Sequence, residues 1–169
     1  DYIAINISSP NTEKLRDLSK VEHFDYLLKI IKSKQDDLSV LFGYRPIFIK
    51  ISPDESCEDL NNICNSILKN KIDGIICSNT TTDHTDPKGL GGISGRPLKK
   101  KATDTLIQVR NLLGDNLPII ASGGVMSSKD YLEKIDAGAN LVQLYTGFIF
   151  EGPKLIDDIV NLDSKVRNT

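Results

Sequence analysis

Five short runs of apolar, mostly β-branched residues recur along the chain, and a segment with helical periodicity follows each of them. The runs cover residues 2–7, 47–51, 74–77, 118–121 and 141–144. Because most are continuously apolar rather than alternating, they are typical of parallel strands that are buried on both faces. Strand followed by helix, five times over, predicts a parallel α/β architecture.

The segments between the runs predict the helices. Apolar residues recur at three- and four-residue steps within residues 21–34 and 56–69, and residues 98–113 form a third candidate. Ser127 is a suitable N-cap for a short helix that runs to Ile135, and Gly138 ends it. A last helix is expected over residues 153–162.

The residues at the strand ends favour a (β/α)8 barrel over a doubly wound sheet. Each run finishes in polar or small residues, and all strand ends of a barrel converge on one face. An open sheet concentrates its site at one switch point, and no Gly-x-Gly-x-x-Gly motif follows any run. Five units cannot close a barrel of eight strands. We therefore expect residues 1–169 to supply about strands 4 to 8 of a single barrel domain, with three units lying upstream.

Composition argues against several classes of protein. The formal net charge is −2, so no basic field points to nucleic acid. None of the three cysteines forms a Cys-x-x-Cys pair, which argues against a zinc site. No apolar run approaches the roughly 20 residues that span a bilayer. Any membrane contact is expected from a segment outside this sequence.

The first strand end carries a cluster of polar side chains. Asn6, Ser9 and Asn11 surround Pro10, which stiffens the turn. Asparagine offers two donors and an acceptor, so a pair of them suits a planar amide or imide ligand. A turn that caps the following helix explains the same residues equally well.

Lys50 lies inside an apolar strand, where a lysine is costly unless it is paired or used. It would place a positive charge beside an anionic ring or phosphate; alternatively, it reaches solvent from the strand end. The glycines of residues 89–95 let the backbone approach a ligand closely, although an ordinary loop has the same composition.

Two loops near the end of the chain predict a phosphate site. Ser122-Gly123-Gly124 follows the fourth run and Tyr145-Thr146-Gly147 follows the fifth. The loops after strands seven and eight are the usual phosphate site of these barrels, which makes the five runs strands four to eight. A helix N-terminus at Ser127 would add backbone donors.

Taken in order, these motifs resemble the class 2, quinone-dependent dihydroorotate dehydrogenase family over almost the whole chain. The matching stretches are Ile-Asn-Ile-Ser-Ser-Pro-Asn-Thr at 5–12, Ile-Lys-Ile-Ser-Pro-Asp at 49–54, Ser-Asn-Thr-Thr at 78–81, Gly-Gly-Ile-Ser-Gly-Arg-Pro-Leu at 91–98 and Gly-Ala-Asn-Leu-Val-Gln-Leu-Tyr at 138–145.

The resemblance implies a flavoenzyme of pyrimidine synthesis that oxidises dihydroorotate to orotate. FMN would accept the hydride and a membrane quinone would receive the electrons. A peripheral place on an inner membrane, bacterial or mitochondrial, follows from the quinone. Ser9 matches the catalytic base, and serine there, in place of the cysteine of the soluble class 1 enzymes, indicates class 2.

The remaining roles also come from the resemblance, which implies no metal. The FMN contacts would be Asn6, Lys50, Ser78, Gly95, Gly124, Tyr145 and Thr146. The substrate contacts would be Asn6, Asn11, Asn79 and Thr80.

Two other functions stay open at this point. A flavin-free, phosphate-handling barrel enzyme would share the two glycine loops, and a partial barrel without activity would share the strands. The family's amino-terminal helices, which form the quinone tunnel, and its early strands are expected upstream. We therefore expect this chain to be inactive by itself.

Overall fold

The computed structural model describes residues 1–9, 21–83 and 91–167. The strands are β1 (Ile3–Asn6), β2 (Ile47–Ile51), β3 (Gly74–Cys77), β4 (Ile119–Ser122) and β5 (Leu141–Gln143). The helices are α1 (Val21–Phe42), α2 (Cys57–Lys69), the 3-10 turn η2 (Arg96–Leu98), α3 (Lys99–Leu113), α4 (Ser128–Asp136), α5 (Thr146–Glu151) and α6 (Lys154–Arg167). All five predicted strands and all five predicted helices are confirmed, whereas α5 was not predicted.

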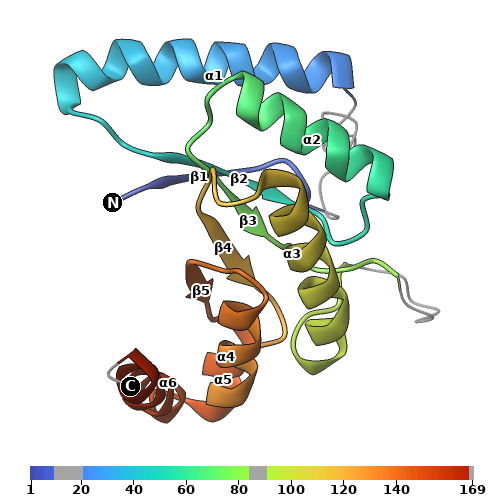
Figure 1. Ribbon diagram of the computed structural model, residues 1–169, viewed down its shortest axis with the longest axis vertical. Helices are drawn as coiled ribbons and strands as arrows, with labels where there is room; N and C mark the ends of the chain where they lie inside the picture. The colour runs from blue at the N-terminus through green and yellow to red at the C-terminus, as the bar shows by residue number, and fades with distance from the viewer. Residues whose placement is uncertain (10–20, 84–90, 168–169) are drawn as a thin grey trace.

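The order of the strands confirms the barrel, which the strand ends favoured over a doubly wound sheet. All four pairings are parallel, and each strand pairs with the next one along the chain, in the order β1-β2-β3-β4-β5. The helices follow the outside of the curving sheet and leave its other face uncovered (Figure 1). A doubly wound sheet reverses its strand order and carries helices on both faces. The described fold is therefore part of a (β/α)8 barrel.

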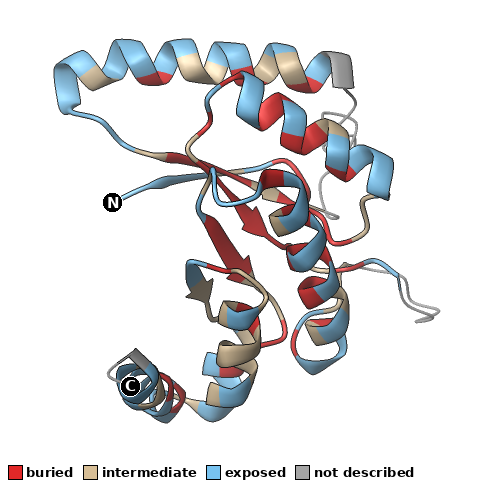
Figure 2. Cartoon of the chain, viewed as in Figure 1, coloured by how far each residue is buried: buried red, intermediate tan, exposed pale blue. Residues whose placement is uncertain are grey.

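The two faces of the sheet bury different side chains. Those that point toward the helices, such as Ile49, Ile75 and Ile119, belong to the main core. Their neighbours Phe48 and Ile76 point to the inner face and form a smaller cluster with Ile120. Figure 2 shows that buried residues concentrate on the central strands and on the helix surfaces next to them. Burial on both faces explains why these strands are continuously apolar.

Local capping fixes the helix boundaries. The Ser56 side chain accepts a hydrogen bond from the Asp59 N–H and so begins α2. Helix α1 continues eight residues beyond the predicted end at 34, to Phe42. Gly43, with φ of 77°, follows it. The prediction stopped early because Val40, Leu41 and Phe42 are exposed and break the periodic pattern.

Within the described ranges, no helix combines the length and hydropathy needed to cross a membrane.

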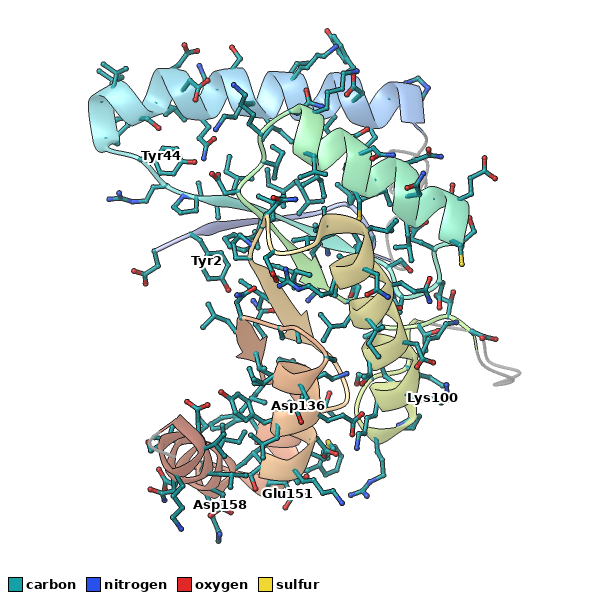
Figure 3. All side chains as sticks on the ribbon, in the orientation of Figure 1. Tyr2, Tyr44, Lys100, Asp136, Glu151 and Asp158 are labelled. Carbon is teal, nitrogen blue, oxygen red and sulfur yellow. The ribbon has the colours of Figure 1, made fainter. Side chains whose placement is uncertain are left out.

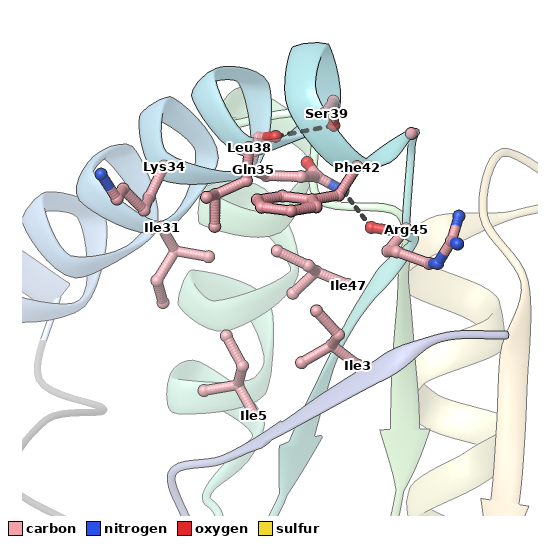
Figure 4. Close-up of a pocket in the computed structure, with 11 residues that line it drawn as sticks. Ile3, Ile5, Ile31, Lys34, Gln35, Leu38, Ser39, Phe42, Arg45 and Ile47 are labelled. Carbon is pink, nitrogen blue, oxygen red and sulfur yellow. Dashed lines mark hydrogen bonds between the residues drawn. The ribbon is translucent and has the colours of Figure 1, made fainter.

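An apolar groove of about 380 Å³ runs between α1 and the first two strands. Figure 4 shows Ile3, Ile5 and Ile47 on its floor, facing Ile31, Leu38 and Phe42 from the helix. β1 is an edge strand of the sheet, and Ile3 is 49% exposed. The groove lies at the start of β2, opposite the end of the sheet where the predicted site residues gather.

Candidate active site

The register of the parallel strands brings their polar carboxyl ends together. Asn6 pairs with Lys50, and Ser122 pairs with Gln143. The N–H of Ser78, just after β3, donates to the carbonyl of Ser122 at 2.9 Å. The carboxyl ends of five adjacent parallel strands therefore form one rim, which is where barrel enzymes place their chemistry.

A hydrogen-bonded cluster joins the first strand end to the third. The Ser8 hydroxyl donates to Asn6 Oδ1 at 3.0 Å and lies 3.0 Å from the carbonyl of Lys50. Asn79 Nδ2 donates to Asn6 Oδ1 and to Ser8 Oγ, both at 3.2 Å. The structure thus brings together Asn6 and Asn79, two of the predicted substrate contacts. Ser8 is the buried centre of the cluster, with 1% exposure.

Backbone hydrogen bonds hold the predicted substrate residues after β3. The Asn79 N–H donates to the carbonyl of Ile51 at 2.9 Å, so the segment remains attached to β2 beyond the strand. Asn79 Oδ1 accepts the Thr80 N–H at 2.9 Å. Both side chains lie half-buried on the rim, where a ligand can reach them.

Lys50 lies on the inner face of the sheet, on the same side as Phe48 and two residues along the strand. Its side chain is half-buried, and burial lowers the pKa of its ammonium group. Among the described residues, no carboxylate lies within ion-pair distance of Lys50 Nζ. A partly desolvated cation without a protein counter-charge is suited to an anionic ligand.

At the other end of the rim, glycines allow the loops to pack closely. Gly95 has φ of 68°, and a Cβ there would lie 3.0 Å from Cγ2 of Thr146. The Thr146 hydroxyl donates to Ser94 Oγ at 2.9 Å, so the loops after β3 and β5 meet. Gly124 has φ of 77°, and a Cβ there would overlap the backbone of Lys99. The structure therefore brings Gly95 and Thr146 together and packs Gly124 against the start of α3.

The residue before Thr146 faces outward. Tyr145 precedes α5 and is 78% exposed. Gly147 packs so closely on the Val125 carbonyl that no side chain would fit there. The loop after β5 is thus fixed on the loop after β4, and the Tyr145 ring projects from the rim.

An internal carboxylate occupies the helix N-terminus where the sequence predicted donors for a ligand phosphate. Asp130 accepts the Met126 N–H at 3.0 Å and the Ser127 hydroxyl at 2.9 Å, and it forms an ion pair with Lys99. Burial raises the pKa of Asp130, but Lys99, Ser127 and the Met126 N–H together lower it below its usual value. This carboxylate fixes the loop between Gly124 and α4, and it uses donors that were expected to bind the ligand.

A fully buried lysine lies beneath the same loop. Lys134 Nζ donates to the Thr103 hydroxyl at 2.6 Å and lies 3.3 Å from the carbonyl of Lys99. Burial lowers the pKa of Lys134 to about 8. Because the Lys99 backbone lies against Gly124, this lysine supports the glycine loop from below.

The remaining predicted residues have separate outcomes. Ser9 is half-buried next to Ser8. Asn11 lies outside the described residues. Tyr2, labelled in Figure 3, points across the inner face, and its hydroxyl accepts a 2.7 Å hydrogen bond from Gln143 of β5. In residues 1–9, 21–83 and 91–167, no group of three or more His, Cys, Asp or Glu side chains is placed to bind a metal.

Sequence reasoning missed Ser8, Asp130 and Lys134. Ser8 sits beside Ser9 in the same motif, and strand alternation was the available signal that the two point in different directions. Asp130, three residues after the predicted N-cap Ser127, fits a capping box. Nothing in the sequence distinguishes Lys134 from a surface lysine.

Comparisons with known proteins agree with this arrangement. A family model described as dihydroorotate dehydrogenase matches residues 1–164. The chain is 49% identical over 166 residues to a dihydroorotate dehydrogenase (quinone) of Vibrio parahaemolyticus, covering 94% of this chain and 49% of the relative. It is 50% identical over 167 residues to the protein of the same name from Aliivibrio salmonicida, covering 95% and 50%.

Solved structures show the same likeness. The chain superposes on the Eimeria tenella enzyme, described as DHODH in complex with ferulenol, with a TM-score of 0.85 and 30% identity, covering 94% of this chain and 48% of that one. The ligand-free enzyme gives 0.84 and 33%, covering 94% and 49%. The chain spans about half the length of the curated relatives it matches. By sequence and by fold, it belongs to the dihydroorotate dehydrogenase family.

Proposed function

We propose that this chain supplies the substrate-binding rim and part of the flavin site of an enzyme that oxidises dihydroorotate to orotate in pyrimidine synthesis. The observation that carries the proposal is the cluster of Asn6, Ser8 and Asn79 beside the half-buried Lys50. Amide groups that are held in place suit the planar amide and imide edges of a pyrimidine ring. The relatives' printed name supports the same substrate.

FMN is the cofactor that we propose for the inner face of the sheet. Gly95, Gly124, Tyr145 and Thr146 would hold its phosphate, because the glycine loops expose backbone where side chains would not fit. Asn6, Lys50 and Ser78 would contact the ring system. When bound, FMN supplies the hydride acceptor. The lysine ammonium would stabilise the negative charge that develops on reduction.

Ser9 is the residue that we propose as the base. It would take the proton from C5 of dihydroorotate while hydride leaves C6. Asn79 and Thr80 would orient the ring through its polar edges, together with Asn11. A fixed orientation of this kind contributes strongly to catalysis, because the reacting atoms start close together.

The electrons would pass to a membrane quinone, as the relatives' name suggests. We therefore propose that the working enzyme lies peripherally on an inner membrane, either on the cytoplasmic face of a bacterial membrane or on the mitochondrial inner membrane. Contact with quinone would come from amino-terminal helices, and the barrel would be completed by strands 1 to 3. We propose that both lie upstream of this chain, and that this chain forms the C-terminal part of one barrel domain.

The test uses the chain by itself and a chimera in which residues 1–164 replace the matching half of the Vibrio parahaemolyticus relative. Each protein is mixed with FMN, and dihydroorotate is added without oxygen while the visible spectrum is recorded. We expect the bound flavin of the chimera to bleach and the chain alone to remain unreduced.

A Ser9→Ala chimera is the matched control. It should bind FMN fully but reduce it at least about a hundredfold more slowly, since general-base catalysis contributes roughly that much. Failure of the chimera to bind FMN would favour a flavin-free barrel enzyme. Flavin that binds but does not bleach would contradict the substrate assignment.

A further inference from the structure

The Asp54 carboxylate lies just beyond the carboxyl end of β2 and was not among the predicted site residues. It forms an ion pair with Lys101 Nζ at 2.7 Å. It also accepts the Thr82 N–H at 2.8 Å, the Thr82 hydroxyl at 3.1 Å and the Thr81 hydroxyl. One side chain thus joins the loop after β2, the segment after β3 and the first turn of α3.

The segment that Asp54 holds is continuous with the proposed substrate contacts. Thr81 and Thr82 directly follow Asn79 and Thr80. Thr81 also pairs with Ile93 through two backbone hydrogen bonds, of 3.2 and 2.8 Å. The backbone after β3 is therefore anchored on both sides of Thr80, by Ile51 through Asn79 and by Asp54 through Thr82.

Burial and charge distinguish this ion pair from an ordinary surface pair. The side chains of Asp54 and Lys101 are 15% and 34% exposed. Burial raises the pKa of Asp54, but Lys101, Thr81 and the Thr82 N–H lower it to about 2, so it is a carboxylate at neutral pH. Lys100 and Asp104, on the same helix, are 87% and 49% exposed. An exposed pair of that kind contributes little.

We infer that Asp54 is a positioning residue for substrate, which sets the orientation of Asn79 and Thr80 through the Thr81–Thr82 backbone. The inference rests on the proposed function and extends it, since it assigns recognition of the pyrimidine ring to a carboxylate that does not touch the ring. Lys101 completes the arrangement by neutralising Asp54, and it also pairs with Asp83 at 3.0 Å.

Amide hydrogen exchange tests the inference without any ligand. We compare wild type with Asp54→Asn, in the chain and in the chimera, and use Asp104→Asn as the matched control. We expect exchange in residues 79–83 to be about tenfold faster in Asp54→Asn, because the charged acceptor of the Thr82 N–H and of two threonine hydroxyls is lost. Strands β3 and β4 should keep their protection. Equal acceleration in the strands, or none at 79–83, would overturn the inference.

Ligand affinity provides the second measurement. In the FMN-loaded chimera, Asp54→Asn should weaken orotate binding about tenfold and leave FMN affinity unchanged, because hydrogen bonds from a misplaced donor weaken steeply. Equal loss of both affinities would overturn a positioning role. If wild type binds no orotate, the proposed function fails, and the exchange pattern still decides whether Asp54 holds this segment.

A second pair of variants covers the case in which Asp54→Asn fails to fold. Lys101→Met removes one partner and leaves the carboxylate with its threonine donors, and Lys100→Met is its control. Exchange at 79–83 should rise severalfold in Lys101→Met only. The same change in both variants would contradict the inference.

Discussion

The two ends of the candidate site are built by different means. Around β1 and β3, the side chains of Asn6, Ser8 and Asn79 form the hydrogen bonds that shape the rim. Around β4 and β5, the shape comes from backbone at Gly124 and Gly147, where a side chain would overlap the backbone of Lys99 and Val125. Substitutions at the first end should therefore affect chemistry more than folding, and substitutions at the second should do the reverse.

The layers beneath the two ends also differ. We call the first end, which Asn6 and Asn79 shape, the amide end. Under it lies the apolar core, with Ile51 and Cys77 fully buried. We call the second end, around β4 and β5, the glycine end. Under it lie three charged groups, Asp130, Lys99 and Lys134. A loop supported by buried charges depends on their protonation, so the glycine end should respond to pH in a way that an apolar base would not.

The largest effect should come from Gly124→Ala. Its positive φ and the overlap of a Cβ with the Lys99 backbone both oppose a side chain. We expect the free energy of unfolding to fall by about 3 kcal/mol or more, from backbone strain and overpacking together. Urea denaturation measures this change.

Gly152→Ala separates the two causes. Gly152 also has a positive φ, of 70°, but a Cβ there would meet nothing within 4 Å. Strain alone should cost about 1 to 2 kcal/mol. Equal losses in the two variants would show that close packing at Gly124 does not matter, and the comparison between the ends would lose its basis.

An intermediate effect is expected from Lys134→Met, through its pH dependence. Because the folded pKa is about 8, below the ordinary value of 10.5, the unfolded chain binds more protons between these values. The contribution of Lys134 to stability therefore rises with pH across this window. We expect the free energy of unfolding of wild type, relative to the variant, to rise by about 2 kcal/mol from pH 8 to 10.5.

The difference between the two proteins is the quantity to measure. Burial raises the pKa of Cys64 to about 11 and also raises that of Cys77, and these thiols change wild-type stability in the opposite direction. The Cys64 contribution is common to both proteins and cancels in the difference. Because the charge of Lys134 itself lowers the pKa of Cys77, both proteins are compared in a Cys77→Ala background. A difference that stays flat with pH would mean that the glycine end does not rest on a buried charge.

The smallest expected effect on stability is the difference between alanine variants of two neighbouring serines, Ser8 and Ser9. Ser8 donates to Asn6 and accepts from Asn79, so Ser8→Ala should lower the free energy of unfolding by about 1 kcal/mol. Ser9→Ala should lower it by less, because Ser9 is only half-buried whereas Ser8 is 1% exposed. In the chimera, flavin reduction should show the reverse order, with Ser9→Ala slower. If the two variants changed the free energy of unfolding and the rate of flavin reduction equally, a structural role for Ser8 and a chemical role for Ser9 would be contradicted.

The sequence predicted the fold well because the strands are buried on both faces and the turns carry clear signals. β2 and β3 have the predicted bounds, since continuous apolar runs end at polar residues. α5 escaped prediction because its six residues are too short to show a period. The extension of α1 escaped because its exposed apolar residues follow no stripe.

The candidate site could be predicted only in part. Side chains with distinctive chemistry, such as Asn6, Lys50 and Asn79, stand out at strand ends. The groups that hold them depend on contacts between distant segments, as with Asp54 and Thr82 or Lys134 and Thr103. An aspartate in a loop and a lysine in a helix look like surface residues, but the fold buries Lys134 fully and leaves the Asp54 side chain 15% exposed.

The strand order also has a kinetic consequence. Every strand pairs with its neighbour along the chain, so each step of sheet formation closes only one helical connection. Parallel pairing is intrinsically slow, because a connection must close before each contact forms, but pairing in chain order keeps each closure shorter than one that joins distant segments. The hydrogen bond from Gln143 to Tyr2 spans 141 positions, further than the 73 positions between Asn79 and Asn6. It closes a longer loop than the strand pairings do, so it should form after them. The chain has no tryptophan, so the fluorescence of Tyr2, with the other four tyrosines replaced by phenylalanine, would report the final stage of folding.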